Sequence, residues 1–118
     1  MAVIVIADDN AGVLDVMARS LRRAGHTVIA VPDGETAWER IRDRQPDLAI
    51  IDGVMPGTDG FEVCKRVHGD PVTTHIPVIV CSGWLPTDDQ LPCATATLPK
   101  PFMPAELIAK VDLVLDNQ

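Results

Sequence analysis

The chain has 118 residues, of which 47% are hydrophobic and 23% charged, and its formal net charge is −7 at pH 7. This length suits one domain that buries about two-thirds of its unfolded surface in one core. The acidic balance disfavours direct contact with nucleic acid, whose phosphates repel a negative surface. No apolar run approaches the ~20 residues of a membrane-spanning helix, so we expect no membrane association.

The start of the chain, MAVIVIADDN, lacks the basic segment and the apolar length of a secretory signal, so we expect a cytoplasmic protein. Its cysteines, Cys64, Cys81 and Cys93, are odd in number and lack CxxC spacing, which favours reduced thiols over a disulfide framework or a zinc site. Cys81 is expected to be a buried apolar residue and Cys93 a surface thiol. A redox pair between these two is the alternative.

Short runs that are apolar throughout, instead of alternating, predict strands covered on both faces. In chain order they are AVIVIA (2–7), HTVIAV (26–31), DLAIID (47–52), PVIVCS (77–82) and a weaker last run, ATATLP (94–99).

Helical spacing of apolar residues occupies the intervals between these runs. A first helix ends at Gly25, a second follows the candidate N-cap Asp33, a third ends at Gly69, and the last opens at Pro104. The apolar positions are Leu14, Met17 and Leu21 in the first, Trp38 and Ile41 in the second, Phe61, Cys64 and Val67 in the third, and Leu107, Val111, Val114 and Leu115 in the last. Strict alternation of strands and helices predicts a doubly wound α/β fold with a parallel sheet.

One interval departs from this regularity. Between 77–82 and 94–99, Pro86 is suited to begin a helix and Pro92 to end it almost at once. We therefore expect the fourth helix of the fold to be short or irregular.

Polar side chains stand where the predicted strands end: Asp8 and Asp9, Asp52, Ser82 and Lys100. The carboxyl ends of parallel strands meet at one edge of the sheet, where the sites of such folds lie. Carboxylates close together need a cation, and carboxylate oxygens supplemented by water and phosphate are typical of Mg²⁺. Taken singly, each aspartate is more often a turn former or a helix cap than a functional residue, Ser82 more often a turn residue and Lys100 more often a solvated cation. The set as a whole favours a site.

Over essentially its whole length, 1–118, the chain resembles the receiver domain of two-component response regulators. The resemblance rests on four motifs in order, VIVIADDN, LAIIDGVMPGTDGFEVCKRV, PVIVCSG and LPKPF. It implies a single receiver domain of flavodoxin-like fold, with a five-stranded parallel sheet in the order 2-1-3-4-5 flanked by helices. It also implies a signalling domain and not an enzyme, whose chemistry is limited to its own phosphorylation and a slow autodephosphorylation.

The resemblance assigns the phosphoryl chemistry to three residues. Asp52 would be the phosphoacceptor, with a sensor histidine kinase or a phosphotransfer protein as donor. Lys100 would pair with Asp52 and then with the phosphoryl oxygens. Ser82 would donate its hydroxyl to the phosphate and move towards it. The Lys100–Pro101 bond is similar to a Lys–Pro bond that is commonly cis in this family.

The resemblance also implies a Mg²⁺ site. Asp9, Asp52 and the backbone carbonyl of Val54 would ligate the ion, and Asp8 would hold it largely through water. The expected consequence of phosphorylation is a change of conformation that is passed to a downstream protein target or to a fused output domain.

Three positions depart from the family pattern. Val54 and Trp84 take the places that flank the phosphoryl group, and neither offers a carboxylate or amide to orient attacking water, which leads to the hypothesis of slow autodephosphorylation. The alternative for Trp84 is simple surface packing. Thr97 stands where the family usually has an aromatic residue that rotates inward with the hydroxyl residue. Thr97 does not fill that volume, so this coupling is not expected; Trp84 is a candidate substitute.

Two rival functions remain open. A non-phosphorylated pseudo-receiver would act only as a protein-interaction module, although every residue type of the site is present. A phosphatase of the haloacid dehalogenase type forms an acyl phosphate too, but it needs a second aspartate two residues after the nucleophile, where this chain has Val54.

Overall fold

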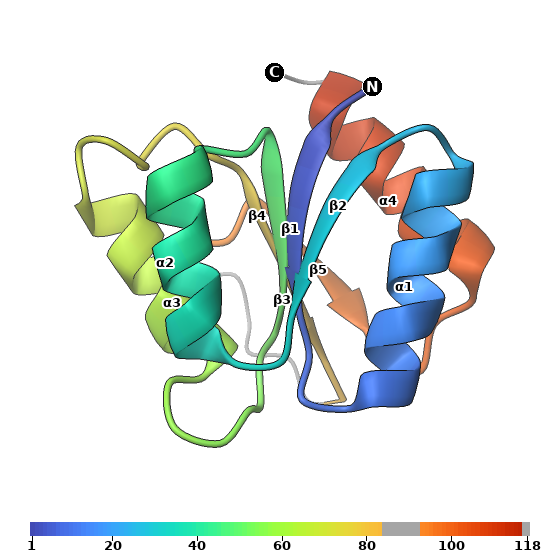
Figure 1. Cartoon of the computed structure of the whole chain (residues 1–118), viewed down its shortest axis with the longest axis horizontal. Helices are drawn as coiled ribbons and strands as arrows, with labels where there is room; N and C mark the ends of the chain where they lie inside the picture. Colours follow the sequence, from blue (N-terminus) through green and yellow to red (C-terminus); the bar gives the residue numbers. More distant parts are fainter. Residues whose placement is uncertain (84–92, 117–118) are drawn as a thin grey trace.

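In the computed structural model, residues 1–83 and 93–116 are described, and the structural statements that follow concern these residues. One parallel sheet of five strands has the order β2-β1-β3-β4-β5 (Figure 1). In chain order the elements are β1 (Val3–Ala7), α1 (Ala11–Arg23), β2 (Thr27–Val31), α2 (Gly34–Arg44), β3 (Leu48–Asp52), α3 (Gly60–Gly69), β4 (Val78–Ser82), β5 (Ala96–Pro99) and α4 (Pro104–Asp116).

This order confirms the expected doubly wound sheet. The helix expected near Pro86 and Pro92 falls on residues 84–92, outside the described residues, so its form stays a prediction. Within the described part of the chain, no helix is long and apolar enough to cross a membrane.

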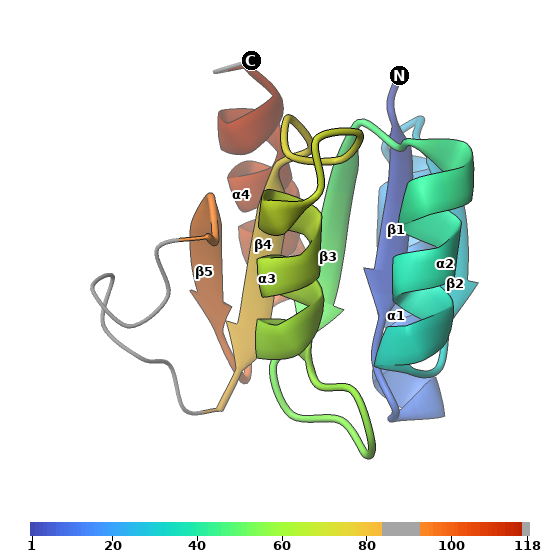
Figure 2. The ribbon, with the colours of Figure 1, turned by 90° about the vertical axis from the view of Figure 1, so that its left-hand side faces the viewer.

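Helices cover both faces of the sheet, α1 and α4 on one side and α2 and α3 on the other (Figures 1 and 2). Alternate residues of one strand therefore belong to different cores. In β1, Ile4 and Ile6 pack with α1 and α4, whereas Val5 and Ala7 pack with α2 and α3. The double cover explains why the central strands β1, β3 and β4 read as continuous apolar runs, because both of their faces are largely buried.

Local signals in the sequence set where the helices begin. The side chains of Asn10, Asp33 and Asp59 accept hydrogen bonds from the backbone N–H three residues on, at the starts of α1, α2 and α3. These caps satisfy amides that have no partner inside the helix. After α1 the chain turns at Gly25, whose φ of 98° lies in the left-handed region that glycine adopts without strain.

The cap at Asp33 gives a testable prediction. Asp33→Ala is expected to lower the free energy of unfolding by about 1 kcal/mol, whereas Asp33→Asn, which keeps a capping oxygen, is expected to lose less. The hydrogen bonds from Thr36 hold the pKa of Asp33 below its usual value of 3.8. The advantage of the wild type over Asp33→Asn should therefore be present above about pH 4 and disappear as the pH falls through the lowered pKa.

Urea denaturation of the wild type and both variants across this pH range measures the effect. A difference between the wild type and Asp33→Asn that does not change with pH would contradict the role given to the charge.

Candidate functional site

The ends of four strands bring the candidate residues to one edge of the sheet. Asp8 follows β1, Asp52 ends β3 beside it, Ser82 ends β4, and Lys100 follows β5. Asp8, Asp52 and Ser82 are 1%, 6% and 1% exposed, and Thr73 is the one other polar residue that is buried in the described part of the chain. The sequence-predicted residues thus gather in one buried, polar place, as their positions at strand ends require.

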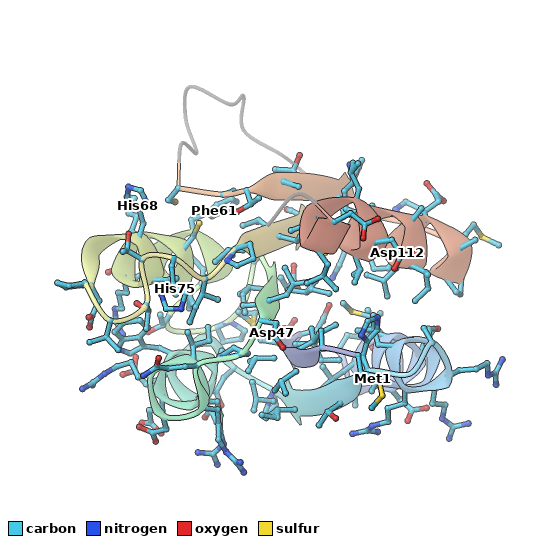
Figure 3. The ribbon with its side chains drawn as sticks, turned by 90° about the horizontal axis from the view of Figure 1, so that it is seen from above. Met1, Asp47, Phe61, His68, His75 and Asp112 are labelled. Carbon is cyan, nitrogen blue, oxygen red and sulfur yellow. The ribbon has the colours of Figure 1, made fainter. Side chains whose placement is uncertain are left out.

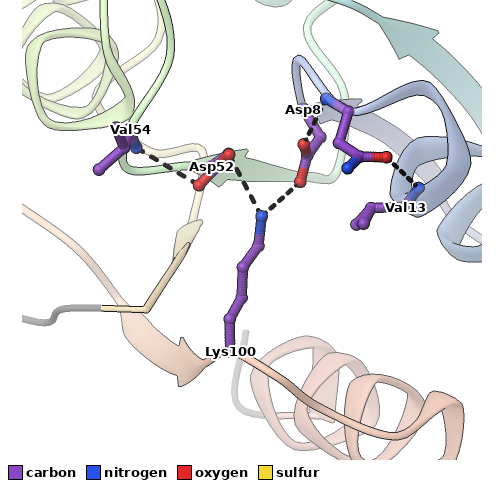
Figure 4. A network of polar contacts seen from close by, with 6 residues as sticks. Asp8, Val13, Asp52, Val54 and Lys100 are labelled. Atoms are coloured by element: carbon purple, nitrogen blue, oxygen red, sulfur yellow. Dashed lines mark hydrogen bonds and ion pairs between the residues drawn. The ribbon is translucent and has the colours of Figure 1, made fainter.

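Lys100 forms ion pairs with both buried carboxylates of this site. Its Nζ lies 2.7 Å from Asp8 Oδ2 and 3.2 Å from Asp52 Oδ2, so a single ammonium bridges two carboxylates (Figure 4). Burial opposes the charge of Lys100. The hydrogen bond and charge of Asp8, followed by those of Asp52, outweigh burial and raise the pKa of Lys100. The lysine therefore remains a cation in the site.

The surroundings of Asp52 disfavour its charged form, in contrast to those of Lys100. Burial raises the pKa of Asp52, and repulsion from Asp8 raises it further, while Lys100 and the N–H of Val54 offset part of the rise. The Val54 N–H donates to Asp52 Oδ1 at 3.3 Å. The surroundings therefore disfavour the charged form of this carboxylate, and an added cation would offset that cost.

Asp8 has a second task that sequence reasoning gave only as an alternative. Its Oδ1 accepts from the N–H of Asn10 at 2.8 Å, and Asn10 in turn caps α1 by accepting from Val13 at 3.1 Å (Figure 4). The turn-forming role and the site role of Asp8 therefore coexist, one for each carboxylate oxygen. The role of Asn10 was missed, although its place before an apolar helical run is a recognisable N-cap signal.

The acidic residues fit a divalent cation. One oxygen from each of Asp8, Asp9 and Asp52 lies within 4.8 Å of the others, and Asp9 is exposed whereas the other two are buried. Hard oxygen ligands with one open, solvent-facing side suit Mg²⁺, which keeps several waters. The side chain of Val54 is 66% exposed, so the chain beside Asp52 also borders solvent.

Glycines allow the loop after β3 to pass close beneath the site. A Cβ at Gly60 would collide with the backbone carbonyl of Asp52, and a Cβ at Gly53 would lie 2.9 Å from the ring of Phe61 and 3.2 Å from the Cβ of Ser82. Gly57 has a φ of 76°, in the left-handed region that glycine adopts without strain, and makes a sharp turn in this loop. Phe61 was expected only as a helical apolar position, and its contact with the site was missed because it depends on how closely α3 approaches β3.

The remaining predicted residues are placed as follows. Thr97 is half-buried on β5 and pairs with Val80 of β4. Lys100–Pro101 is cis, as the resemblance implied. Trp84 lies outside the described residues, so its shielding and switching roles stay predictions.

The cysteines required a correction. Cys81 is buried as expected, but it belongs to the core under α1 and α4, whereas Cys93 packs with the core under α2 and α3. The sheet therefore separates them, and a Cys81–Cys93 pair is wrong for this fold. Cys93 is half-buried rather than a surface thiol, and its neighbour is Cys64.

The chain is similar in sequence and in fold to known proteins. The profile of the response regulator receiver domain family matches residues 4–112. The phosphate regulon transcriptional regulatory protein PhoB of Pseudomonas aeruginosa is 34% identical over 95% of this chain and 51% of its own length. The DNA-binding response regulator MtrA of Mycobacterium tuberculosis is 30% identical over 92% of this chain and 48% of its own. The chain thus spans about half the length of these curated relatives.

A solved structure supports the same fold. The chemotaxis protein CheY4 of Vibrio cholerae superposes with a TM-score of 0.88 at 26% identity, and the match covers 97% of this chain and 98% of that one.

The close approach at Gly60 is testable. Gly60→Ala is expected to lower the free energy of unfolding by about 1–3 kcal/mol, because the added methyl group must push α3 away from the Asp52 carbonyl. Gly69→Ala is the matched control at the other end of α3, since a Cβ there meets nothing within 4 Å. Urea denaturation should show the control unchanged or slightly stabilised. Equal effects at the two glycines would refute the packing argument.

Proposed function

We propose that this chain, which belongs to the response regulator receiver domain family, accepts a phosphoryl group on Asp52 and signals through the change that follows. The observation that carries the proposal is the pair of contacts from Lys100 Nζ to Asp8 and Asp52 at a buried strand end. A cation held against a carboxylate with raised pKa is positioned for the arrival of further negative charge.

The proposed reaction is an in-line displacement. An oxygen of Asp52 attacks the phosphorus of a phosphohistidine on the donor protein, the P–N bond breaks, and the imidazole leaves. Such transfers depend mainly on positioning and charge neutralisation. Asp9, Asp52 and the carbonyl of Val54, with Asp8 through water, would hold Mg²⁺, which supplies charge neutralisation at the phosphoryl oxygens when bound.

Residues of the chain would then stabilise the product. Lys100 exchanges its contact with the Asp52 carboxylate for one with the phosphoryl oxygens. Ser82 is buried beside Gly53, and its hydroxyl is proposed to donate to the phosphate by moving towards it. The backbone N–H of Lys100 donates a hydrogen bond to the carbonyl of Ser82 at 2.9 Å. This bond would couple a movement of Ser82 to the position of Lys100.

The proposed partners follow from this reaction. The donor is a sensor histidine kinase or a phosphotransfer protein, and the receiver of the signal is a downstream protein or a fused output domain. MtrA is named as a DNA-binding protein, but this chain matches about half of it. We propose that the residues of this chain make no direct contact with nucleic acid, which the net charge of −7 supports. A cytoplasmic location stays a prediction.

Phosphorylation of Asp52 is the decisive prediction. Incubation with Mg²⁺ and acetyl phosphate or phosphoramidate should add one phosphoryl group, detected by intact-mass spectrometry and mapped to Asp52. Chelation of Mg²⁺ and the Asp52→Asn variant should each abolish it, while Asp59→Asn, which changes an aspartate at the start of α3, should not. If no adduct forms on Asp52, the pseudo-receiver alternative takes the place of this proposal.

The decay of the phosphorylated form tests the role of Val54. Val54→Asn supplies an amide that orients attacking water, so we expect loss of the phosphoryl group to accelerate on the order of tenfold, or ~1.4 kcal/mol in the barrier. Val72→Asn is a matched control, since Val72 is also exposed, at 53%, in the loop before β4. The half-life of the phosphoprotein is measured by intact mass. An unchanged decay in Val54→Asn would remove Val54 from the explanation of slow autodephosphorylation.

A further inference from the structure

Two cysteines meet on the face of the sheet that α2 and α3 cover. Cys64 lies on α3 and is fully buried among apolar residues, and Cys93, which shortly precedes β5, packs against the same cluster. The side chain of Cys93 is close enough to Cys64 to contribute to the raised pKa of that thiol, and both residues belong to one apolar cluster. They are 29 residues apart in sequence (93 − 64), so the fold and not the local chain brings them together.

The two sulfurs differ in their access to solvent. Cys93 is half-buried and lines a cavity of about 300 Å³. His68 at the end of α3 and His75 before β4 line the same cavity (Figure 3). Cys64 is 0% exposed and is not among the residues that line this cavity. Cys93 is therefore the more accessible of the two sulfurs to a small polar oxidant.

We propose that Cys64 and Cys93 form a peroxide-sensitive dithiol that closes to an intramolecular disulfide. The thiolate of Cys93 attacks one oxygen of hydrogen peroxide, the O–O bond breaks, and hydroxide leaves and takes up the thiol proton as water. Cys93 is then a sulfenic acid. The sulfur of Cys64 attacks the sulfur of Cys93, the S–S bond forms, the S–O bond breaks, and the hydroxyl group leaves with the proton of Cys64 as a second water. Two thiols are oxidised by two electrons, and one peroxide is reduced to two waters.

The surroundings assign the order of these steps. Burial raises the pKa of Cys64 far above the usual value for a thiol, and the contact with Cys93 adds to the rise. Cys64 therefore stays protonated and does not react with free peroxide. It becomes the resolving partner only at the sulfenic acid of Cys93, where the departing hydroxyl group takes its proton as its sulfur attacks. The sulfurs must approach to about 2 Å in the disulfide, so Cys93 has to move towards α3.

The disulfide would join two elements that flank the phosphoryl site. Through Phe61, α3 lies against Gly53, next to Asp52, and β5 leads directly into Lys100. The cross-link would fix residue 93 to α3 and thereby constrain both sides of the site. The oxidation itself does not depend on phosphorylation of Asp52, so either proposal stands if the other fails.

Peroxide titration of the full chain tests the pair. In the wild type, free thiols should fall from three to one, the intact mass should fall by two hydrogens, and peptide mapping should give a Cys64–Cys93 linkage that a thiol reductant reverses. The melting temperature should rise in the oxidised form, because the cross-link restricts the unfolded chain. In Cys81→Ala, the matched control from the other face of the sheet, the linkage should form unchanged.

Single variants separate the two steps. Cys64→Ala should accumulate a sulfenic acid on Cys93 that dimedone traps, and Cys93→Ala should leave Cys64 unmodified under the same exposure. Because a core variant can fail to fold, wild type unfolded in urea is a second measurement. There the Cys64–Cys93 selectivity should be lost to mixed pairings. Absence of the linkage in the folded wild type, a linkage through Cys81, or the same selectivity in urea would each overturn the proposal.

Discussion

The ammonium of Lys100 between the carboxylates of Asp8 and Asp52 is the contact on which the rest of the site depends. The three charged groups come from the ends of three different strands, and the two carboxylates are buried whereas Lys100 is partly exposed. Two buried carboxylates without a cation would repel each other and lose their hydration. The sheet order places β1 and β3 side by side and lets the loop after β5 reach across to them. The fold therefore provides the site mainly by holding like charges together around a cation.

α3 has a larger part in this protein than its place on one face of the sheet suggests. Its start is pressed against the backbone of Asp52 and Gly53, which only glycine at position 60 permits. Its middle carries Cys64, which belongs to the same apolar cluster as Cys93. A shift of α3 would change the position of its first residues beside Asp52 and of Cys64 relative to Cys93. The helix also contacts α2 through an ion pair, in which Arg66 Nη1 lies 2.9 Å from Glu35 Oε2.

The signalling route that we propose for this receiver does not use the aromatic residue expected of the family. Thr97 on β5 has no ring to move inward, and the chain has no tyrosine at all. A backbone hydrogen bond from the N–H of Lys100 to the carbonyl of Ser82 links the end of β4 to the residue after β5. A response that travels through strand ends and backbone contacts, instead of through an aromatic rotamer, is consistent with these residues.

The sequence by itself determined the alternation of elements, the caps such as Asp33, and the polar residues at strand ends, because these depend on local periodicity and on the chemistry of single residues. Parallel strands then oblige Asp8, Asp52, Ser82 and Lys100 to share an edge, so most of the site was predictable. Which residues face each other across the sheet was decided only by the tertiary structure. Periodicity alone did not tell that Cys81 and Cys93 lie on opposite faces, that Cys64 is the true neighbour of Cys93, or that Phe61 reaches the site. Each of these depends on the side from which a helix packs and on how closely it approaches, and that is set by contacts between residues far apart in the chain.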